Sequence, residues 1–330
     1  MIGIAVTGSG SAVPDSRLTN EDLSEIVETS NDWIRTRTGI QERRLASPGD
    51  SLADLATTAA RRALDHRGLD PKDVDLIILA TSTADDLFGT ASVIQANLGA
   101  VHATGFDLTA ACSGFIFAMT TAAQFIHTGA YRRAVVIGAD VLSRWVDWTD
   151  RTTCVLFGDG AGAVVMEANE VDHFLGFELR SNGAMNGCLT LGYDPQAQTL
   201  HANATVSQGD YGRIAMNGKE VYRFAVNRVP EVIEKALHRA EVPLASVDWF
   251  VLHQANQRIL DAVADRLHIA PTKMLSNLAN YGNTSAASIP LMLDEAVTAG
   301  KIQPGHVITT AGFGAGLNWG SAVFRWGQAS

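Results

Sequence analysis

The chain has few cysteines and no pattern that would pair them. Its 330 residues include three, Cys112, Cys154 and Cys188, which lie far apart and form no C-x-x-C motif. A secreted disulfide framework or a structural zinc site needs more cysteines at closer spacing. We therefore expect free thiols and a reducing, cytoplasmic location.

Other signals are missing as well. No apolar run reaches the roughly 18 residues of a membrane span, so we expect no membrane association. The segment Met1–Val6 lacks the basic region of a signal peptide and predicts a first strand. The nine histidines contain no H-E-x-x-H pairing, so we expect no metal site. The net charge of −10 argues against nucleic acid as the main partner, because phosphate binding needs a basic face.

What is present indicates a folded α/β protein. Apolar residues make up 46% and charged residues 18% of the chain, which is typical of a globular protein. Short apolar runs predict strands that are buried on both faces. The clearest of these strands are Val74–Ala80, Ala134–Gly138 and Val307–Thr310. Helical spacing alternates with them at Ser51–Arg67, Val229–Ala240 and Gln257–Leu267, which favours layers of helices on a sheet.

A helix-turn-strand pattern occurs twice. Residues 63–79 match 236–252, and the spacing from Cys112 to Gly129, before one predicted strand, equals the spacing from Asn283 to Gly300, before another. Chance similarity between two common units is the alternative. We interpret the chain as two duplicated halves, residues 1–172 and 173–330. We expect the stretch Ser181–Gly212, rich in Gly, Asn, Gln and Asp, to be loop decoration.

Cys112 is the strongest candidate nucleophile. The run Gly105–Leu108 predicts a strand, and apolar residues at helical spacing begin at Phe115, so Cys112 lies at a strand-to-helix turn. Free backbone N–H groups and the helix dipole at such a turn stabilise a thiolate and lower its pKa. The small neighbours of Cys112 leave room for a bulky group. A buried structural cysteine is the alternative, and it is the interpretation we favour for Cys154, in a predicted strand, and for Cys188.

Two polar residues follow in apolar surroundings. His253 comes directly after the predicted strand Trp249–Leu252, at a sheet end where ligands bind in α/β proteins. Asn283 lies between Gly282 and Thr284. The structural alternatives are a hydrogen-bonded core histidine for His253 and an ordinary turn asparagine for Asn283. Brought together with Cys112, they would form a site for acyl transfer through a thioester.

The glycine-rich stretch Gly312–Gly316 follows the last long strand. Its backbone could approach a reacting carbonyl, and its N–H groups could bind an oxyanion. A tight turn between two strands is the alternative. The segment Gly8–Gly10 is not a dinucleotide fingerprint, because Val13 stands where the third glycine would be.

Several segments together resemble β-ketoacyl-[acyl carrier protein] synthase III, a family of thiolase-fold condensing enzymes. The resemblance covers nearly the whole chain, and its specificity comes from the order and spacing of the segments. They are Asn31–Ile40, Ala111–Gly114, Phe157–Ala163, His253–Asn256, Gly282–Ser288 and Trp319–Ala322. It implies a layered αβαβα core of two similar halves, and an acyltransferase that starts type II fatty acid synthesis.

The resemblance also implies the catalytic roles. Cys112 would attack an acyl-CoA and hold the acyl group as a thioester. His253 and Asn283 would hydrogen-bond the thioester carbonyl of malonyl-acyl carrier protein and stabilise the enolate formed when carbon dioxide leaves. The backbone N–H groups of Cys112 and Ala315 would hold the tetrahedral oxyanion. No cofactor is implied, because the CoA thioesters are substrates.

Binding residues follow from the same resemblance. Trp33 and Arg151 would flank the adenine of CoA and Arg37 would meet a CoA phosphate, while Gly218 and Asn256 would line the pantetheine tunnel. A homodimer is implied, with Phe88 reaching into the neighbouring subunit. The residues that would shape the acyl pocket are Phe88, Leu142, Phe157 and Leu189. The residues that would dock the acidic carrier protein are Arg223, Arg258 and Arg266.

Three other functions remain as alternatives. Papain-like cysteine proteases carry Cys, His and Asn in the same chain order, but the C-G-[SA]-C-[WY] segment is missing here. A synthase-III-like enzyme of secondary metabolism would keep the fold, and would use another starter or pass the acyl group to an oxygen or nitrogen acceptor. A non-catalytic binding protein on the same fold is the third. Chalcone-synthase-like enzymes share the triad, whereas chain-elongating synthases use two histidines in place of His253 and Asn283.

Overall fold

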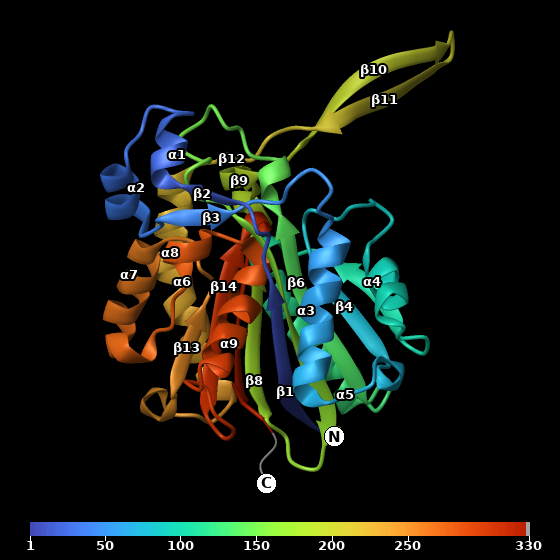
Figure 1. Cartoon of the computed structure of the whole chain (residues 1–330), viewed down its shortest axis with the longest axis vertical. Coiled ribbons are helices and arrows are strands. Elements are labelled where there is room, and N and C mark those ends of the chain that lie inside the picture. The colour runs from blue at the N-terminus through green and yellow to red at the C-terminus, as the bar shows by residue number, and fades with distance from the viewer. Residues whose placement is uncertain (328–330) are drawn as a thin grey trace.

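The body of the protein consists of two β-sheets with helices on both faces (Figure 1). The computed structural model describes residues 1–327. The first sheet has the strand order β1-β7-β6-β4-β5 and the second β13-β14-β15-β8. The strands of the first sheet are β1 (Gly3–Ala12), β4 (Leu76–Ala80), β5 (Thr104–Leu108), β6 (Arg133–Val141) and β7 (Asp159–Asn169). Those of the second are β8 (Phe174–Ser181), β13 (Trp249–Leu252), β14 (Val307–Gly314) and β15 (Asn318–Arg325).

The two sheets are built by the same rules. In the first, β4 pairs with β6 in parallel, and β6–β7 and β7–β1 are antiparallel. In the second, β13 pairs with β14 in parallel, and β14–β15 and β15–β8 are antiparallel. A single parallel bridge from Phe250 to Met274 stands where β5 borders β4 in the first sheet. The expected duplication of an α/β unit is therefore visible in pairing order and direction.

Helices form one layer between the sheets and two outside them. The helices of these layers are α3 (Leu52–Arg67), α4 (Ala91–Leu98), α5 (Gly114–His127), α6 (Gly218–Arg239), α7 (Gln257–Leu267) and α9 (Ser288–Thr298). Helices α5 and α9 contact strands of both sheets, whereas α3 and α4 cover the first sheet and α6 and α7 the second. This is the layered αβαβα arrangement that the sequence analysis expected.

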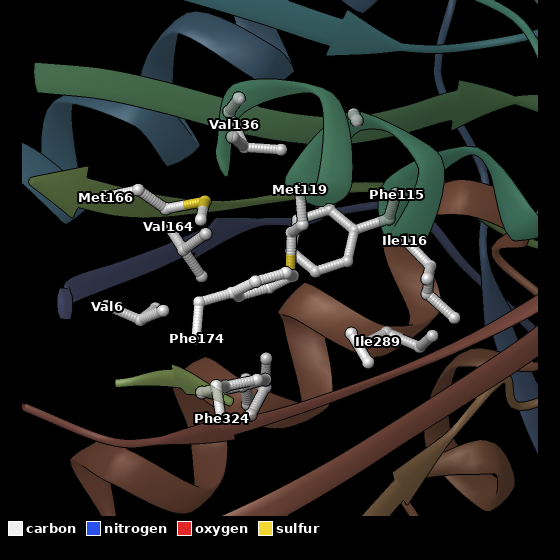
Figure 2. Close-up of a cluster of buried hydrophobic side chains, with 14 of the residues drawn as sticks. Val6, Phe115, Ile116, Met119, Val136, Val164, Met166, Phe174, Ile289 and Phe324 are labelled. Atoms are coloured by element: carbon white, nitrogen blue, oxygen red, sulfur yellow. The ribbon is translucent and has the colours of Figure 1, made fainter. Parts of the chain in front are cut away.

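The central layer is apolar because both of its sides are covered. In Figure 2, Phe115 and Met119 of α5 and Ile289 of α9 lie close to Val164 of β7 and Phe324 of β15. All five side chains are buried. A helix packed between two sheets needs apolar residues around most of its surface, which explains why α5 shows so few polar positions.

The outer helix α3 has one apolar stripe instead. Alanines dominate its buried face, among them Ala56, Ala59 and Ala63. They let its backbone approach β1 so closely that a Cβ at Gly10 would lie 2.3 Å from the Ala59 carbonyl oxygen. Ser51 caps the start of the helix by accepting a hydrogen bond from the Asp54 N–H. The glycines near the first strand therefore serve helix packing.

Shorter elements decorate this core. The short helices are α1 (Asn20–Ser24), α2 (Asn31–Thr38) and α8 (Leu278–Tyr281). The short strands are β2 (Arg17–Thr19), β3 (Glu42–Arg44), β9 (Leu189–Thr190) and β12 (Ala215–Met216). The 3₁₀ turns are η1 (Pro71–Asp73), η2 (Ala111–Ser113), η3 (Leu142–Arg144), η4 (Gly183–Cys188), η5 (Leu244–Ser246), η6 (Pro271–Lys273), η7 (Ser285–Ala287) and η8 (Ala315–Leu317). None of the helices within residues 1–327 combines the length and apolarity needed to cross a membrane.

Three local predictions were wrong. The expected loop Ser181–Gly212 contains a hairpin of β10 (Tyr193–His201) and β11 (Ala204–Tyr211), which projects from the body (Figure 1). Both of its faces are exposed, so its sequence lacks the apolar alternation that reveals a half-buried strand. Cys154 lies in a turn and not in a strand. Helix α6 begins at Gly218 and not near Val229. Proline usually marks the start of a helix, but Pro230 lies inside this one.

Candidate active site

Cys112 lies in the turn that joins β5 to α5. Strand β5 ends at Leu108, the 3₁₀ turn η2 contains Cys112, and α5 begins at Gly114. Ala111 adopts a left-handed conformation with a φ of 48°, which is uncommon for a residue with a Cβ. Next to this left-handed residue, Cys112 lies at the edge of a cavity with 7% of its surface exposed. The thiol is therefore shielded from bulk water and still reachable.

One cavity brings the three expected catalytic residues together. Cys112, His253 and Asn283 all line a cavity of about 110 Å³. His253 comes directly after β13, and its backbone N–H donates to the Ala311 carbonyl at 2.8 Å, which extends the pairing with β14. Asn283 is fixed by its own backbone, whose N–H donates to the Leu156 carbonyl at 2.8 Å. Residues from both halves of the chain thus meet at one point.

Hydrogen bonds orient each of the three side chains. The Ser285 backbone N–H donates to Asn283 Oδ1 at 2.9 Å, so the amide nitrogen is the group that Asn283 can offer to a ligand. His253 Nδ1 and Ser288 Oγ lie 2.8 Å apart. Ser285 Oγ donates to Cys112 Sγ at 3.3 Å. This arrangement differs from a papain-like site, in which the asparagine orients the histidine, and it argues against the protease alternative.

Burial determines the charge of the site. It raises the pKa of the Cys112 thiol to about 12, with the hydrogen bond from Ser285 opposing that shift. It lowers the pKa of His253 to about 3. The expectation that the helix start lowers the pKa of Cys112 was therefore wrong, because loss of hydration outweighs the helix dipole here. At neutral pH the site holds a neutral thiol and a neutral imidazole.

The end of β14 packs against the backbone of Cys112. A Cβ at Gly314 would lie 2.6 Å from the Cys112 nitrogen, so only glycine allows this approach. Ala315 follows in the 3₁₀ turn η8 and lines a larger cavity together with Cys112. Of the glycine-rich stretch, Gly312–Gly314 form the end of β14, and Ala315 and Gly316 begin the turn to β15; the stretch also brings its backbone beside the thiol.

The larger cavity, of about 900 Å³, contains all four residues expected in the acyl pocket. Leu142 and Phe157 are buried, Leu189 is half-buried and Phe88 is fully exposed. Cys112, Phe157 and Leu189 line both cavities. Cys112 therefore lies where a narrow cavity meets a wide one.

The residues expected to hold CoA form two groups. The guanidinium carbons of Arg37 and Arg151 lie 4.7 Å and 5.4 Å from the centre of the Trp33 ring, so these three residues form one cluster. Gly218, the first residue of α6, and Asn256, which caps α7, line the narrow cavity beside Cys112. The narrow cavity thus carries both expected pantetheine contacts.

The three arginines expected to dock a carrier protein lie on α6 and α7, two helices that also contribute residues to the lining of the narrow cavity. All three are exposed. Arg223 pairs with Glu220 at 3.4 Å, and Arg266 donates to Asn227 Oδ1 at 3.0 Å. Arg223 directly follows Tyr222 and Arg258 directly precedes Ile259, and both of these neighbours line the narrow cavity.

Three positioning residues escaped the sequence analysis. Ser285 and Ser288 contact Cys112 and His253, and the segment Gly282–Ser288 already showed hydroxyl residues beside Asn283. Asp140 is fully buried at the end of β6, and burial raises its pKa. It accepts hydrogen bonds from Thr83 Oγ1 and from the Ala286 N–H, which ties the first sheet to η7. The sequence signal that could have identified Asp140 is a single acidic residue at the end of an apolar strand.

Comparisons with known proteins agree with this geometry. The family model described as 3-oxoacyl-[acyl-carrier-protein (ACP)] synthase III matches residues 106–183, and the model of its C-terminal part matches residues 237–326. The chain is 63% identical over 327 residues to beta-ketoacyl-[acyl-carrier-protein] synthase III of Synechococcus elongatus, covering 99% of this chain and 98% of that protein. This chain belongs to the β-ketoacyl-[acyl carrier protein] synthase III family.

Solved structures extend the similarity to the whole fold. The synthase III of Aquifex aeolicus is 42% identical with a TM-score of 0.90, covering 98% of this chain and 100% of that one. The priming β-ketosynthase of the R1128 polyketide pathway is 33% identical with a TM-score of 0.91, covering 100% of this chain and 98% of that one. As a member of the synthase III family the chain has the thiolase-like fold and is an acyltransferase, so both the protease and the non-catalytic alternatives fail.

Proposed function

We propose that this synthase III works through a thioester on Cys112. The reaction is the one that defines its family: an acyl-CoA and malonyl-[acyl carrier protein] condense to 3-ketoacyl-[acyl carrier protein] with release of CoA and carbon dioxide. It starts the assembly of fatty acids. The observation that carries the covalent route is the convergence of Cys112, His253 and Asn283 on one cavity.

The first half-reaction loads the acyl group. Cys112 Sγ attacks the thioester carbonyl of the acyl-CoA, the carbon–sulfur bond to CoA breaks, and the thiol proton is transferred to the departing CoA sulfur. Backbone N–H groups of Cys112 and Ala315 bind the oxyanion of the tetrahedral intermediate. The packing of the Gly314 backbone against the Cys112 nitrogen supports this placement.

The second half-reaction extends the chain. Loss of carbon dioxide from the malonyl group leaves an enolate, whose oxygen needs hydrogen-bond donors. Asn283 supplies one through its amide nitrogen, and His253 supplies another when Nε2 carries a proton. The carbanion attacks the acyl-Cys112 carbonyl, the carbon–sulfur bond to Cys112 breaks, and the released thiolate takes a proton from water to restore the thiol. Because decarboxylation itself creates the carbanion, no base has to remove a carbon-bound proton.

Substrates enter along the narrow cavity in this proposal. The adenine of CoA inserts between Trp33 and Arg151, Arg37 meets a phosphate, and the pantetheine passes Gly218 and Asn256. The acyl chain occupies the wide cavity, among Phe88, Leu142, Phe157 and Leu189. Arg223, Arg258 and Arg266 receive the acidic carrier protein.

We also infer the setting of the enzyme. The exposed Phe88 at the rim of the wide cavity supports a homodimer in which this side chain is covered by the neighbouring subunit. The three cysteines are free thiols, which supports a cytoplasmic location. Protein side chains and backbone groups supply every proposed step, so the CoA thioester is a substrate and no cofactor or metal is required.

The test is mass spectrometry of the intact protein. After incubation with acetyl-CoA we expect the mass of one acetyl group on Cys112, and its loss on adding malonyl-[acyl carrier protein] with formation of the acetoacetyl product. If the condensation proceeds under single-turnover conditions and no acyl-enzyme can be trapped, the covalent route is wrong.

A second candidate keeps the chemistry and changes the pathway. The similarity to the priming β-ketosynthase of the R1128 polyketide pathway favours secondary metabolism. The higher identity to the Synechococcus elongatus synthase favours fatty acid synthesis. A panel of longer and branched acyl-CoAs, together with oxygen and nitrogen acceptors, tests this in the same assay: transfer only to malonyl-[acyl carrier protein] supports fatty acid synthesis, and transfer to another acceptor supports the second candidate.

A further inference from the structure

The hydroxyl of Ser288 lies between the catalytic histidine and a backbone carbonyl. Ser288 is the first residue of α9, and its Oγ is 2.8 Å from His253 Nδ1. The same oxygen donates to the Ser285 carbonyl at 2.9 Å. Both His253 and Ser288 are almost completely buried. Because these groups are shielded from water, they must satisfy their hydrogen bonds with one another.

Counting hydrogens shows which tautomer of His253 these contacts favour. A hydroxyl has one hydrogen to donate and two lone pairs. When that hydrogen goes to the Ser285 carbonyl, Ser288 Oγ accepts from Nδ1–H, and both bonds form. If the hydroxyl donated to Nδ1 instead, its bond to the Ser285 carbonyl would be lost. That carbonyl would still receive the Ser288 backbone N–H. The first arrangement therefore makes one more hydrogen bond.

We propose that Ser288 is a positioning residue that holds His253 in the Nδ1–H tautomer in the free enzyme. Nε2 then bears a lone pair in the cavity that Cys112 also lines. A lone pair at this point gives the Cys112 proton a place to go. The inference deepens the proposed function and rests on it.

The acylation step then balances around His253. As the bond from Cys112 Sγ to the acyl carbon forms, the thiol proton moves to Nε2. As the bond from that carbon to the CoA sulfur breaks, the same proton moves from Nε2 to the CoA sulfur. CoA leaves as the thiol and His253 returns to the neutral Nδ1–H form. The Cys112 thiol proton thus leaves on CoA, and no proton is exchanged with solvent.

The same hydroxyl can serve the second half-reaction. After rotation it donates to Nδ1, and Nε2 then carries the ring proton and donates to the thioester oxygen of the malonyl group. A carbonyl oxygen beside Nε2 favours this form, because it would otherwise meet a lone pair. The change moves one proton from Nδ1 to Nε2 by exchange with water between the two half-reactions. An alanine at position 288 supports neither tautomer.

The decisive measurement is the nitrogen NMR spectrum of histidine-labelled enzyme, with the His253 signals assigned by their absence in a His253→Gln variant. In the free enzyme we expect His253 Nε2 at the position of an unprotonated ring nitrogen. In Ser288→Ala the population shifts toward the Nε2–H form. A predominant Nε2–H tautomer in the unmodified enzyme, or an unchanged spectrum in Ser288→Ala, would overturn the proposal.

Step-resolved kinetics provide the second readout. General acid–base catalysis contributes about 10²- to 10⁴-fold, and Ser288→Ala should slow acylation by acetyl-CoA about 10- to 100-fold. Thr121→Ala is the matched control. It removes a hydroxyl that bonds the Phe117 carbonyl in α5, and its acylation rate should stay within about twofold. Equal slowing in both variants would mean that Ser288 acts only on the fold.

Failure of the two proposals can be told apart. If the unmodified enzyme forms no acyl-Cys112, the covalent route is wrong, and the tautomer measured by NMR still decides the role of Ser288. If acyl-Cys112 forms at the same rate in Ser288→Ala, the covalent route stands and the role of Ser288 is rejected.

Discussion

The two junctions of the site at which a 3₁₀ turn leads into a helix have similar backbones and different chemistry. In the first half a 3₁₀ turn begins at Ala111 and leads into α5. In the second half a 3₁₀ turn begins at Ser285 and leads into α9. Both first residues are left-handed, with φ of 48° and 51°. Yet Cys112 corresponds to Ala286, and Gly114 corresponds to Ser288. One junction supplies the nucleophile, and the other supplies the polar groups around it.

Each junction also rests on a strand of the opposite half. A Cβ at Gly138 of β6 would lie 2.1 Å from the Ala286 carbonyl oxygen, and one at Gly312 of β14 would lie 3.5 Å from the Cys112 carbonyl oxygen. Each half therefore packs a strand against the junction of the other half, and the contact at Gly138 is tighter than the contact at Gly312. A duplicated unit can hold several reactive groups in one place because each copy fixes a different part of the site.

The largest effect should come from removing the nucleophile. Cys112→Ser should lower the condensation rate at least about 10³-fold, because an alcohol is a far weaker acid than a thiol and His253, whose pKa burial lowers to about 3, is too weak a base to activate it. Intact-protein mass spectrometry and product formation report the loss, and thermal unfolding checks the fold. Cys188→Ser, at a half-buried cysteine, should keep its activity. An active Cys112→Ser enzyme would contradict the covalent mechanism.

Removing the enolate donor from the other junction should split the half-reactions. Asn283→Ala should slow decarboxylation of malonyl-[acyl carrier protein] about 10²- to 10³-fold, while acylation by acetyl-CoA continues. Asn283→Asp keeps the oxygen that accepts from the Ser285 N–H and loses the donor, so it should fail in the same step. If both variants lose acylation as severely as decarboxylation, Asn283 has another role.

The asymmetric packing of the junctions predicts unequal tolerance of a methyl group. Gly138→Ala should lower the free energy of unfolding by about 3 kcal/mol, because its Cβ meets rigid backbone. Gly312→Ala should cost about 1 kcal/mol or less, because its nearest neighbour, at 3.3 Å, is the flexible end of Ile116. Denaturant unfolding of the pair measures both. Equal losses would show that the two contacts are equivalent after all.

Ser285→Ala tests the contact between the junctions. It removes the hydrogen bond to Cys112 Sγ, which lowers the pKa of that thiol. The thiol should therefore become harder to ionise, and acylation should slow about 10-fold. Alanine suits the left-handed backbone here, since its counterpart Ala111 adopts it. A rate within twofold of the unmodified enzyme would remove Ser285 from the mechanism.

Burial of the thiol and the imidazole also predicts how stability depends on pH. Burial lowers the pKa of His253 to about 3, so the unfolded chain binds that proton first and stability falls as the pH drops from 6.5 toward 3. Burial raises the pKa of Cys112 to about 12, so the unfolded chain loses that proton first and stability falls as the pH rises from 9.0 toward 12.

Single substitutions should flatten one side of this profile each. His253→Gln should reduce the acid slope, and Cys112→Ala the alkaline slope, by up to about 1.4 kcal/mol per pH unit. Urea unfolding across the pH range measures both slopes. A variant that flattens the other side, or neither, would contradict the assigned pKa shift.

Much of this fold could be predicted from the sequence. Helix α7 matches its expected bounds, and the strand ending at Leu252 places His253 at the edge of the second sheet. The exposed hairpin of β10 and β11 could not be predicted, because it buries neither face and so carries no alternation. Sequence spacing made Asn283 the counterpart of Cys112 in the second half. In the structure the residue at the equivalent backbone position is Ala286, three residues further on. Sequence spacing follows strand and helix lengths, which differ slightly between the two halves.

The sequence by itself determined the layered fold, the family and the identity of Cys112, His253 and Asn283 as one set. These follow from local periodicity and from motif order, which the chain carries in linear form. Only the tertiary structure decided the charge state of the site and the residues that orient it. Burial of the thiol and the imidazole comes from packing two halves together, and the contacts of Ser285 and Ser288 exist only after that packing. Long-range desolvation and hydrogen bonding are properties of the folded chain, and no segment carries them alone.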